Sequence, residues 1–189
     1  MKKYWEHLKV ISKHKWLVMV HCFKAGIPWR GLMHDNSKFG PTEFFTSARY
    51  FQGNSSPIDA EKAEKGYSYA WQHHKGKNPH HWEYWIDNIG TYKNTPVKVP
   101  YKYVVEMVCD WIGAGQTYSK TKWTIKEPWE YYKKVRGERI LHPHTEELIL
   151  YFLYAISIGG LEAFYWYAKN CKTDYETGWM TKESRHYED

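Results

Sequence analysis

The stretch Val104-Val105-Glu106-Met107-Val108-Cys109-Asp110-Trp111-Ile112 places apolar and acidic side chains on one helical repeat. Val104, Val108 and Ile112 recur every four residues, which predicts that much of this helix is buried. Glu106 and Asp110 are also four residues apart, so they share a face of the helix. A carboxylate on a buried helix needs a partner, and a metal ion is a simple one. The stretch therefore indicates a helical fold with acidic groups in its interior.

Apolar residues repeat at helical spacing along most of the chain, and no convincing strand alternation is present. The spacing predicts helices over residues 3–24, 29–39, 42–51, 60–74, 80–87, 101–118, 128–136 and 144–170. Gly and Pro residues predict loops over 76–79 and 88–100, and a polar connection covers 120–126. Because the 189 residues include no repeats or long linkers, we expect an all-α, single-domain helical bundle over residues 1–171 and a loosely held polar tail over 172–189.

Charge, cysteine content and hydropathy indicate which partners and which cellular location to expect. A net charge of +6 favours anionic partners, of which phosphates are the simplest. The three cysteines lie far apart without a CxxC pattern, which is typical of reduced thiols in a cytoplasmic protein. Residues 148–161 form an uncharged run of 14 residues, shorter than the ~20 that span a bilayer. We expect this run to be a buried core helix and the protein to have no membrane association; its oligomeric state is left open.

Histidines and carboxylates form a second pattern. The pair His34-Asp35 lies in Gly31-Leu32-Met33-His34-Asp35-Asn36-Ser37-Lys38-Phe39. Four of the 11 histidines fall within residues 73–81, and His14 and Asp110 complete the order H…HD…HH…HH…D. Such nitrogen and oxygen donors suit Fe, Mn, Zn, Co or Ni. Because consecutive helical side chains diverge by about 100°, His34 and Asp35 can meet one metal only near a helix end, or they serve two metals.

These residues resemble the HD superfamily of metal-dependent phosphohydrolases, an all-α group, and within it a family of small phage and bacterial proteins. The resemblance covers roughly residues 10 to 150. It rests on His14-Lys15-Trp16-Leu17-Val18, on His34 through Phe39 with Glu43-Phe44, on Ala70-Trp71 with His74 and Asn78, on His80-His81-Trp82, and on Glu106-Met107 with Asp110-Trp111. The resemblance implies a cytoplasmic bacterial protein, phage-encoded in some cases, with an HD-like bundle around a central metal site.

The same resemblance implies a ligand set. His14, His34, Asp35 and Asp110 would hold the first metal, whereas His74 and His81, with or without His80, would hold a second metal or the substrate phosphate. The spacing of 20 residues between His14 and His34 is short for the superfamily, so His21, seven residues further along the same face, competes with His14. We favour His14 because Val18 follows it at the superfamily's spacing.

The remaining candidates each have a functional and a structural interpretation. Lys38 would contact the substrate phosphate, or it is a solvated lysine. Glu43 would be a catalytic base or would orient a ligand, or its charge complements a helix N-terminus. Glu106 is expected behind the metal ligands or in a structural ion pair. Lys75 would steer anions and His80 would contact the substrate, although basic residues on exposed loops usually do neither; His73 is expected to face solvent.

We expect hydrolysis of a nucleotide or another phosphate ester by metal-activated water, with Asp35, Lys38 and Glu43 as the catalytic residues. Two other classes stay open. One is a di-iron oxygenase of the HD type, which iron content and a mixed-valence EPR signal would distinguish. The other is a non-enzymatic nucleic-acid or host-protein binder with a structural metal, although Lys and Arg form no dense stripe. One or two divalent transition metals are the expected cofactors; no haem or nucleotide cofactor is indicated.

Overall fold

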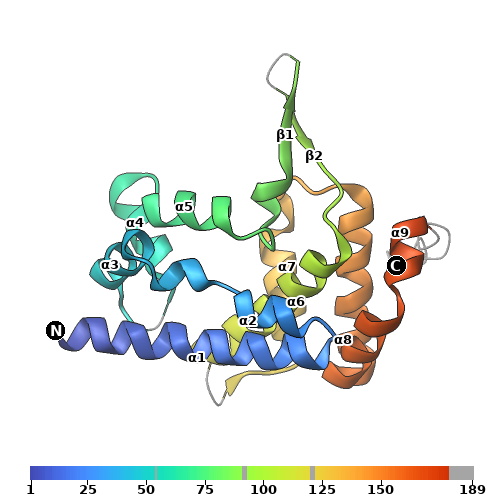
Figure 1. The fold of residues 1–189 in the computed structure, drawn as a ribbon, viewed down its shortest axis with the longest axis horizontal. Coiled ribbons are helices and arrows are strands. Elements are labelled where there is room, and N and C mark those ends of the chain that lie inside the picture. The colour runs from blue at the N-terminus through green and yellow to red at the C-terminus, as the bar shows by residue number, and fades with distance from the viewer. Residues whose placement is uncertain (54, 91–92, 120–121, 179–189) are drawn as a thin grey trace.

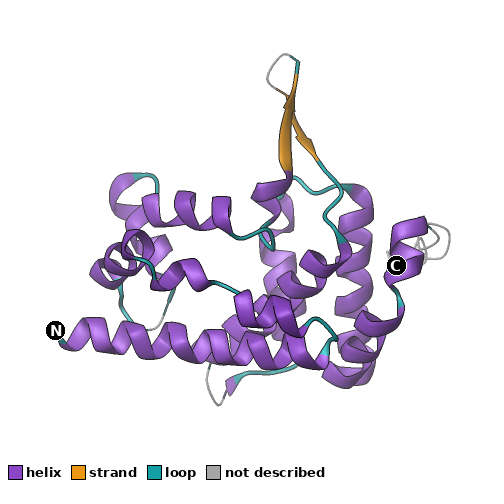
Figure 2. Cartoon of the chain, viewed as in Figure 1, coloured by secondary structure: helices purple, strands orange, loops and turns teal. Residues whose placement is uncertain are grey.

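The computed structural model describes residues 1–53, 55–90, 93–119 and 122–178, and within them helices account for nearly all regular structure (Figures 1 and 2). The predicted all-α fold is therefore confirmed. The elements are, in chain order, α1 (Lys2–Lys24), α2 (Pro28–Met33), the 3-10 helix η1 (Asn36–Phe39), α3 (Pro41–Tyr50), α4 (Pro57–Lys65), α5 (Tyr69–Lys77), the 3-10 helix η2 (Trp82–Trp85), β1 (Ile86–Ile89), β2 (Lys93–Pro96), α6 (Tyr101–Tyr118), α7 (Glu127–Val135), the 3-10 helix η4 (Arg136–Glu138), α8 (Pro143–Asn170) and α9 (Lys172–Thr177).

Helix α6 lies in the core, packed between α1 on one side and α7 and α8 on the other. Val104, Val108 and Ile112 are fully buried, as their four-residue repeat predicts. The approach of α1 to α6 is close because Gly113 has no side chain: a Cβ there would lie 2.6 Å from Cγ2 of Val18. This contact brings the middle of α1 beside the acidic face of α6.

Two of the predicted helices are interrupted. The helix expected over 29–39 ends at Met33, and η1 begins at Asn36, so the pair His34-Asp35 forms the turn between them. The helix expected over 60–74 is two helices, because Gly66 ends α4 with φ of 80° and the hydroxyl of Ser68 caps α5. Helix α5 also continues to Lys77, through the start of the loop predicted over 76–79.

The 3-10 helix η2 covers residues 82–85 of the helix predicted over 80–87, and a small antiparallel hairpin replaces the end of that helix and part of the loop predicted over 88–100. After η2, strand β1 pairs with β2 in the register Ile86↔Pro96 and Ile89↔Lys93, and the hairpin projects from the body of the molecule (Figure 2). The sequence did not reveal it because four-residue strands offer too few positions for an alternation to be recognised.

Helix α8 is long and apolar, with a mean hydropathy of 1.6 in its most apolar window, and by length and composition alone it could cross a membrane. Its buried residues, among them Leu148, Ile149 and Phe152, pack in the core as predicted for this segment. Gly160 departs from helical geometry, with φ of 70° and ψ of −166°. The helix is therefore kinked within its apolar stretch.

The tail predicted from residue 172 is not loose at its start. Residues 172–177 form α9, and Tyr175 is buried, with its hydroxyl donating to the carbonyl oxygen of Val99 at 2.6 Å. Its ring also lies 5.8 Å from that of Tyr101. A single buried tyrosine thus fixes a segment whose composition is polar; the rest of the predicted tail, 179–189, lies outside the described residues.

Candidate metal centre

The turn between α2 and η1 presents His34 and Asp35 together. Asp35 adopts the left-handed conformation with φ of 52°, which only glycine, asparagine and aspartate visit readily. Lys15 on α1 holds the turn, since its Nζ donates to the carbonyl oxygens of Leu32 at 2.9 Å and of His34 at 2.7 Å. The expectation that adjacent residues converge only near a helix end is met here, with backbone strain concentrated at Asp35.

A first cluster of potential ligands combines α1, the turn and α6: His14, His34, Asp35 and Asp110. Nε2 of His14 lies 3.0 Å from Oδ1 of Asp110 and 3.6 Å from Oδ2 of Asp35. Nε2 of His34 lies 3.2 Å from the same Oδ2. One donor atom from each of the four residues lies within 4.8 Å of every other, which is close enough for a shared cation.

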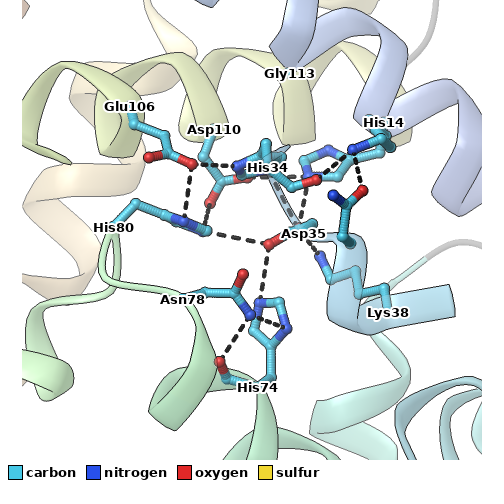
Figure 3. Close-up of polar contacts among 12 residues, drawn as sticks. His14, His34, Asp35, Lys38, His74, Asn78, His80, Glu106, Asp110 and Gly113 are labelled. Atoms are coloured by element: carbon cyan, nitrogen blue, oxygen red, sulfur yellow. Dashed lines mark hydrogen bonds and ion pairs between the residues drawn. The ribbon is translucent and has the colours of Figure 1, made fainter. Parts of the chain in front are cut away.

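A second cluster uses the other oxygen of Asp35. Oδ1 lies 3.3 Å from Nε2 of His74 and 3.4 Å from Nε2 of His80, and His81 completes this group. Figure 3 shows Asp35 between the His14 and His34 side of the site and His74, with His80 beside it. Asp35 therefore belongs to both clusters, one oxygen to each, as a carboxylate that bridges two cations does.

Buried polar atoms that make no hydrogen bond of good geometry mark the interior of both clusters. His34 and Asp35 are 0% and 1% exposed, yet Nε2 of His34 and both carboxylate oxygens of Asp35 make no hydrogen bond of good geometry. The same holds for both ring nitrogens of His14 and of His80 and for Nε2 of His81. Because leaving buried polar atoms unpaired is costly and rare, this donor set fits one or two divalent metals.

Glu106 orients two of the imidazoles from behind. Its Oε1 lies 3.0 Å from Nδ1 of His34 and 3.3 Å from Nδ1 of His80, and its Oε2 accepts from Nε of Arg30 at 2.7 Å. Burial alone would raise the pKa of Glu106, but the hydrogen bond with Nδ1 of His34 and the close approach of Nδ1 of His80 lower it to about 2. With Nδ1 held in this way, each ring presents Nε2 to Asp35, an arrangement that raises the basicity of a metal ligand.

Glu43 has the same relation to His74. Its Oε2 accepts from Nδ1 of His74 and its Oε1 from Nδ1 of His73, both at 2.7 Å. Asn78 adds a bond from its Nδ2 to the carbonyl oxygen of His74 at 2.8 Å. Of the three roles expected for Glu43, the contact with His74 fits the one that orients a ligand, and its position in the first turn of α3 fits charge complementarity with that helix. His73, expected to face solvent, is half-buried against it.

The charges around Asp35 are strongly coupled. Nζ of Lys38 lies 2.5 Å from Oδ2 of Asp35. Burial lowers the pKa of Lys38, but the negative charges of Asp35 and Asp110 outweigh this and raise it, so the ammonium stays charged. Burial, followed by the neighbouring His80 and His74, holds the pKa of His81 well below its usual value, which keeps its imidazole neutral, the form that binds metals.

The structure also places the three remaining candidates. His21, the competitor of His14, hydrogen-bonds with the Tyr165 hydroxyl at 2.6 Å and with Oε1 of Gln116 at 2.9 Å, outside both clusters, which agrees with the preference for His14. His80, expected to join His74 and His81 or to contact the substrate, is fully buried within the second cluster and lines the cavity described next. Lys75, expected to steer anions, is half-buried but does not line the cavity described next.

A cavity of about 230 Å³ opens onto the clusters. Six of the residues in its wall are those expected at the site, namely His14, Lys38, His74, His80, His81 and Asp110. The wall also includes Glu83, Tyr131 and Arg139, none of which the sequence pattern singled out. Arg139 lies 29 residues beyond Asp110, outside any recognisable motif, so only the contacts of its guanidinium with Trp111 in α6 and Tyr131 in α7 reveal it.

A sequence model described as "Family of unknown function (DUF5662)" matches residues 3–155. The match spans most of the chain and all of the residues in the two clusters, so the chain belongs to this family. No curated protein and no solved structure is similar enough to the chain to count as a match.

Proposed function

We propose that this member of the family is a metal-dependent phosphohydrolase acting on a nucleotide or another phosphate ester. The observation that carries the proposal is the pair of four-residue clusters that share Asp35 and open into one cavity. Enzymes that transfer phosphoryl groups to water often hold two metal ions close together, and two ligand clusters that share a carboxylate would suit such a pair. The ordered motifs that resemble the HD superfamily support the same reaction.

Bound divalent metals would polarise the phosphoryl group and lower the pKa of water toward neutrality. The chain's own residues supply the rest. Lys38 lines the cavity beside Asp35, where its ammonium would neutralise charge that grows on the phosphoryl oxygens. Glu106 and Glu43 keep the imidazoles of His34, His80 and His74 in one orientation, which avoids reorganisation during the reaction. The net charge of +6 would favour the approach of anionic substrates.

Asp35→Asn is the sharpest test, because asparagine also tolerates the left-handed conformation at φ of 52° while removing the bridging charge. We expect the variant to fold, to lose most of its bound metal and to lose turnover of phosphomonoesters. Metal content is measured by elemental analysis of untagged protein, and turnover by phosphate release from a panel of nucleotides and sugar phosphates. Asp87→Asn, at an exposed position in β1, is the matched control and should change neither.

Two outcomes would contradict the proposal: full metal content and turnover in Asp35→Asn, or a metal-loaded wild type that hydrolyses no ester in the panel. A salt-dependent shift of DNA or RNA that persists in metal-free Asp35→Asn would instead favour the non-enzymatic binder.

The large number of histidines in the two clusters favours a second candidate function. Five histidines and two aspartates make up the two clusters that share Asp35, a donor set that also suits a pair of irons. Iron as the metal bound on isolation, with a mixed-valence EPR signal and O₂ consumption but no phosphate release, would assign the site to a di-iron oxygenase.

A further inference from the structure

Two polar side chains in the cavity wall lie outside both metal-ligand clusters and still have unpaired buried atoms. They are Glu83, in η2, and Arg139, which directly follows η4. Oε2 of Glu83 and Nη1 of Arg139 are buried and make no hydrogen bond. Both residues line the cavity that the ligands line. Because an unpaired buried donor and acceptor each carry a cost, their presence in a cavity wall points to a ligand that pairs with them.

Aromatic rings fix the guanidinium of Arg139. Its Cζ lies 4.4 Å from the ring centroid of Trp111 and 5.4 Å from that of Tyr131. The two rings are themselves edge to face, with centroids 5.4 Å apart. A guanidinium held in this way loses little freedom when it binds a planar group, because its plane is already set. Trp82 adds a further aromatic residue to the cavity wall.

Lys38 and Arg139 have different surroundings within the same cavity. Lys38 contacts Asp35 of the metal centre at 2.5 Å, whereas Arg139 contacts the aromatic rings and interacts electrostatically with Glu83. The first position suits a phosphate beside the metals. The position of Arg139 does not suit a second anion, since the carboxyl group of Glu83 would repel it.

We infer that Glu83 and Arg139, with Trp82 and Trp111, form a subsite that binds the base of a nucleotide whose phosphate lies at the metal centre. A nucleobase is flat, stacks on aromatic rings and presents hydrogen-bond acceptors and donors at its edge. The guanidinium of Arg139 would donate to the acceptors, and the Glu83 carboxyl oxygen would accept from an amino or imino group. This inference rests on the proposed function and narrows its substrate class to nucleotides.

The test compares two esters that differ only in the base: nucleoside 5′-monophosphates and ribose 5-phosphate. We expect wild-type kcat/KM to be higher for at least one nucleotide. Arg139→Met should lower that kcat/KM at least about tenfold, because a site built for hydrogen bonds rejects ligands it cannot pair with. Its kcat/KM for ribose 5-phosphate and its metal content should stay unchanged. Arg136→Met, on the exposed surface of η4, is the matched control.

Glu83→Gln provides an independent second variant, since it replaces a carboxyl acceptor by an amide of the same shape. We expect it to change which of the four bases is preferred, with Glu138→Gln, exposed in η4, as its control. An equal loss for the nucleotide and for ribose 5-phosphate in Arg139→Met would overturn the inference, as would unchanged base preference in both variants.

A separate binding measurement keeps failure of the subsite distinguishable from failure of the proposed function. If no ester is hydrolysed, titration with nucleosides that lack phosphate is followed by isothermal titration calorimetry, which measures binding directly. Binding by the wild type that Arg139→Met weakens would uphold the base subsite. Equal affinity in both proteins, or no binding to either, would overturn it.

Discussion

Oε1 of Glu106 lies 3.0 Å from Nδ1 of His34, and neither side chain has any exposed surface. This contact turns the His34 ring so that Nε2 faces Asp35 at 3.2 Å. Glu106 meets His80 in the same way, at 3.3 Å. A buried carboxylate behind the two rings thus sets the direction of one imidazole in each cluster, and several measurable properties depend on such contacts.

Removing the charge of Glu106 should weaken metal binding without removing a ligand. We expect Glu106→Gln to lower metal affinity by about 10- to 100-fold, because the amide offers one acceptor oxygen to the three donors that surround it. Affinity is measured by competition with a chromogenic chelator. Glu162→Gln, whose side chain is 83% exposed beside Lys24, is the control. Unchanged affinity in Glu106→Gln would mean that the ring orientation does not matter for binding.

His14 and His21 lie on the same helix and should respond in opposite ways to replacement by alanine. His14→Ala should lose metal, because Nε2 of His14 lies 3.0 Å from Oδ1 of Asp110 and 3.6 Å from Oδ2 of Asp35 in the first cluster. His21→Ala should keep metal but lose about 1–3 kcal/mol of unfolding free energy, since it leaves Tyr165 and Gln116 without their partner. Metal stoichiometry and urea unfolding of the chelated proteins give both quantities. A metal-free His21→Ala beside a metal-loaded His14→Ala would reverse the assignment.

The contact between α1 and α6 should be sensitive to one methyl group. A Cβ at Gly113 would lie 2.6 Å from Cγ2 and 3.3 Å from the backbone nitrogen of Val18. We expect Gly113→Ala to destabilise the fold by about 1–3 kcal/mol, because the helices must separate, and to weaken metal binding by moving His14 away from Asp110. Gly76→Ala in α5 is the matched control, because no atom lies within 4 Å of the Cβ position. Alanine there should raise the free energy of unfolding by roughly 0.5–1 kcal/mol, since it favours the helix more than glycine does. Thermal unfolding measures both effects: the Tm should fall in Gly113→Ala and rise in Gly76→Ala.

The buried His7 should make stability depend on pH below neutrality. Burial, and then the charge of Lys38, lower the pKa of His7 from 6.5 to about 4. Between these two pH values, His7 is mostly protonated in the unfolded chain and mostly neutral in the folded protein. The stabilisation is complete above pH 6.5 and is lost as the pH falls toward 4. Between pH 7 and pH 5 the loss from this residue is about 2 kcal/mol.

The measurement compares urea unfolding of the wild type and of His7→Phe, both metal-free, at pH 7 and pH 5. Phenylalanine keeps the ring contacts with Phe44 and Phe51, whose centroids lie 5.4 and 5.3 Å away, and removes the titrating group. When the pH is lowered from 7 to 5, the free energy of unfolding should fall by about 2 kcal/mol less in the variant than in the wild type. Identical losses would show that His7 is protonated as easily in the folded protein as in the unfolded one.

The sequence by itself determined the helices and the chemistry of the donors. A four-residue repeat such as Val104, Val108 and Ile112 is a local property, and burial of one helical face follows from it. The identity of the donor residues is also a property of the sequence, and the resemblance of their order to the HD superfamily led us to expect that His14, His34-Asp35 and Asp110 converge. The break in the predicted helix at His34-Asp35 and the hairpin of β1 and β2 could not be predicted. Each depends on a few residues whose local preference for one type of secondary structure is weak.

Only the tertiary structure decided which donors face one another. His14 rather than His21 reaches Asp110 because Gly113 lets α1 approach α6 at Val18. His80 joins the ligands because Glu106 holds its ring, and Arg139 enters the cavity from a segment without a motif. These relations depend on distances between segments far apart in the sequence, and such distances are set by how helices pack, which no local pattern of residues contains.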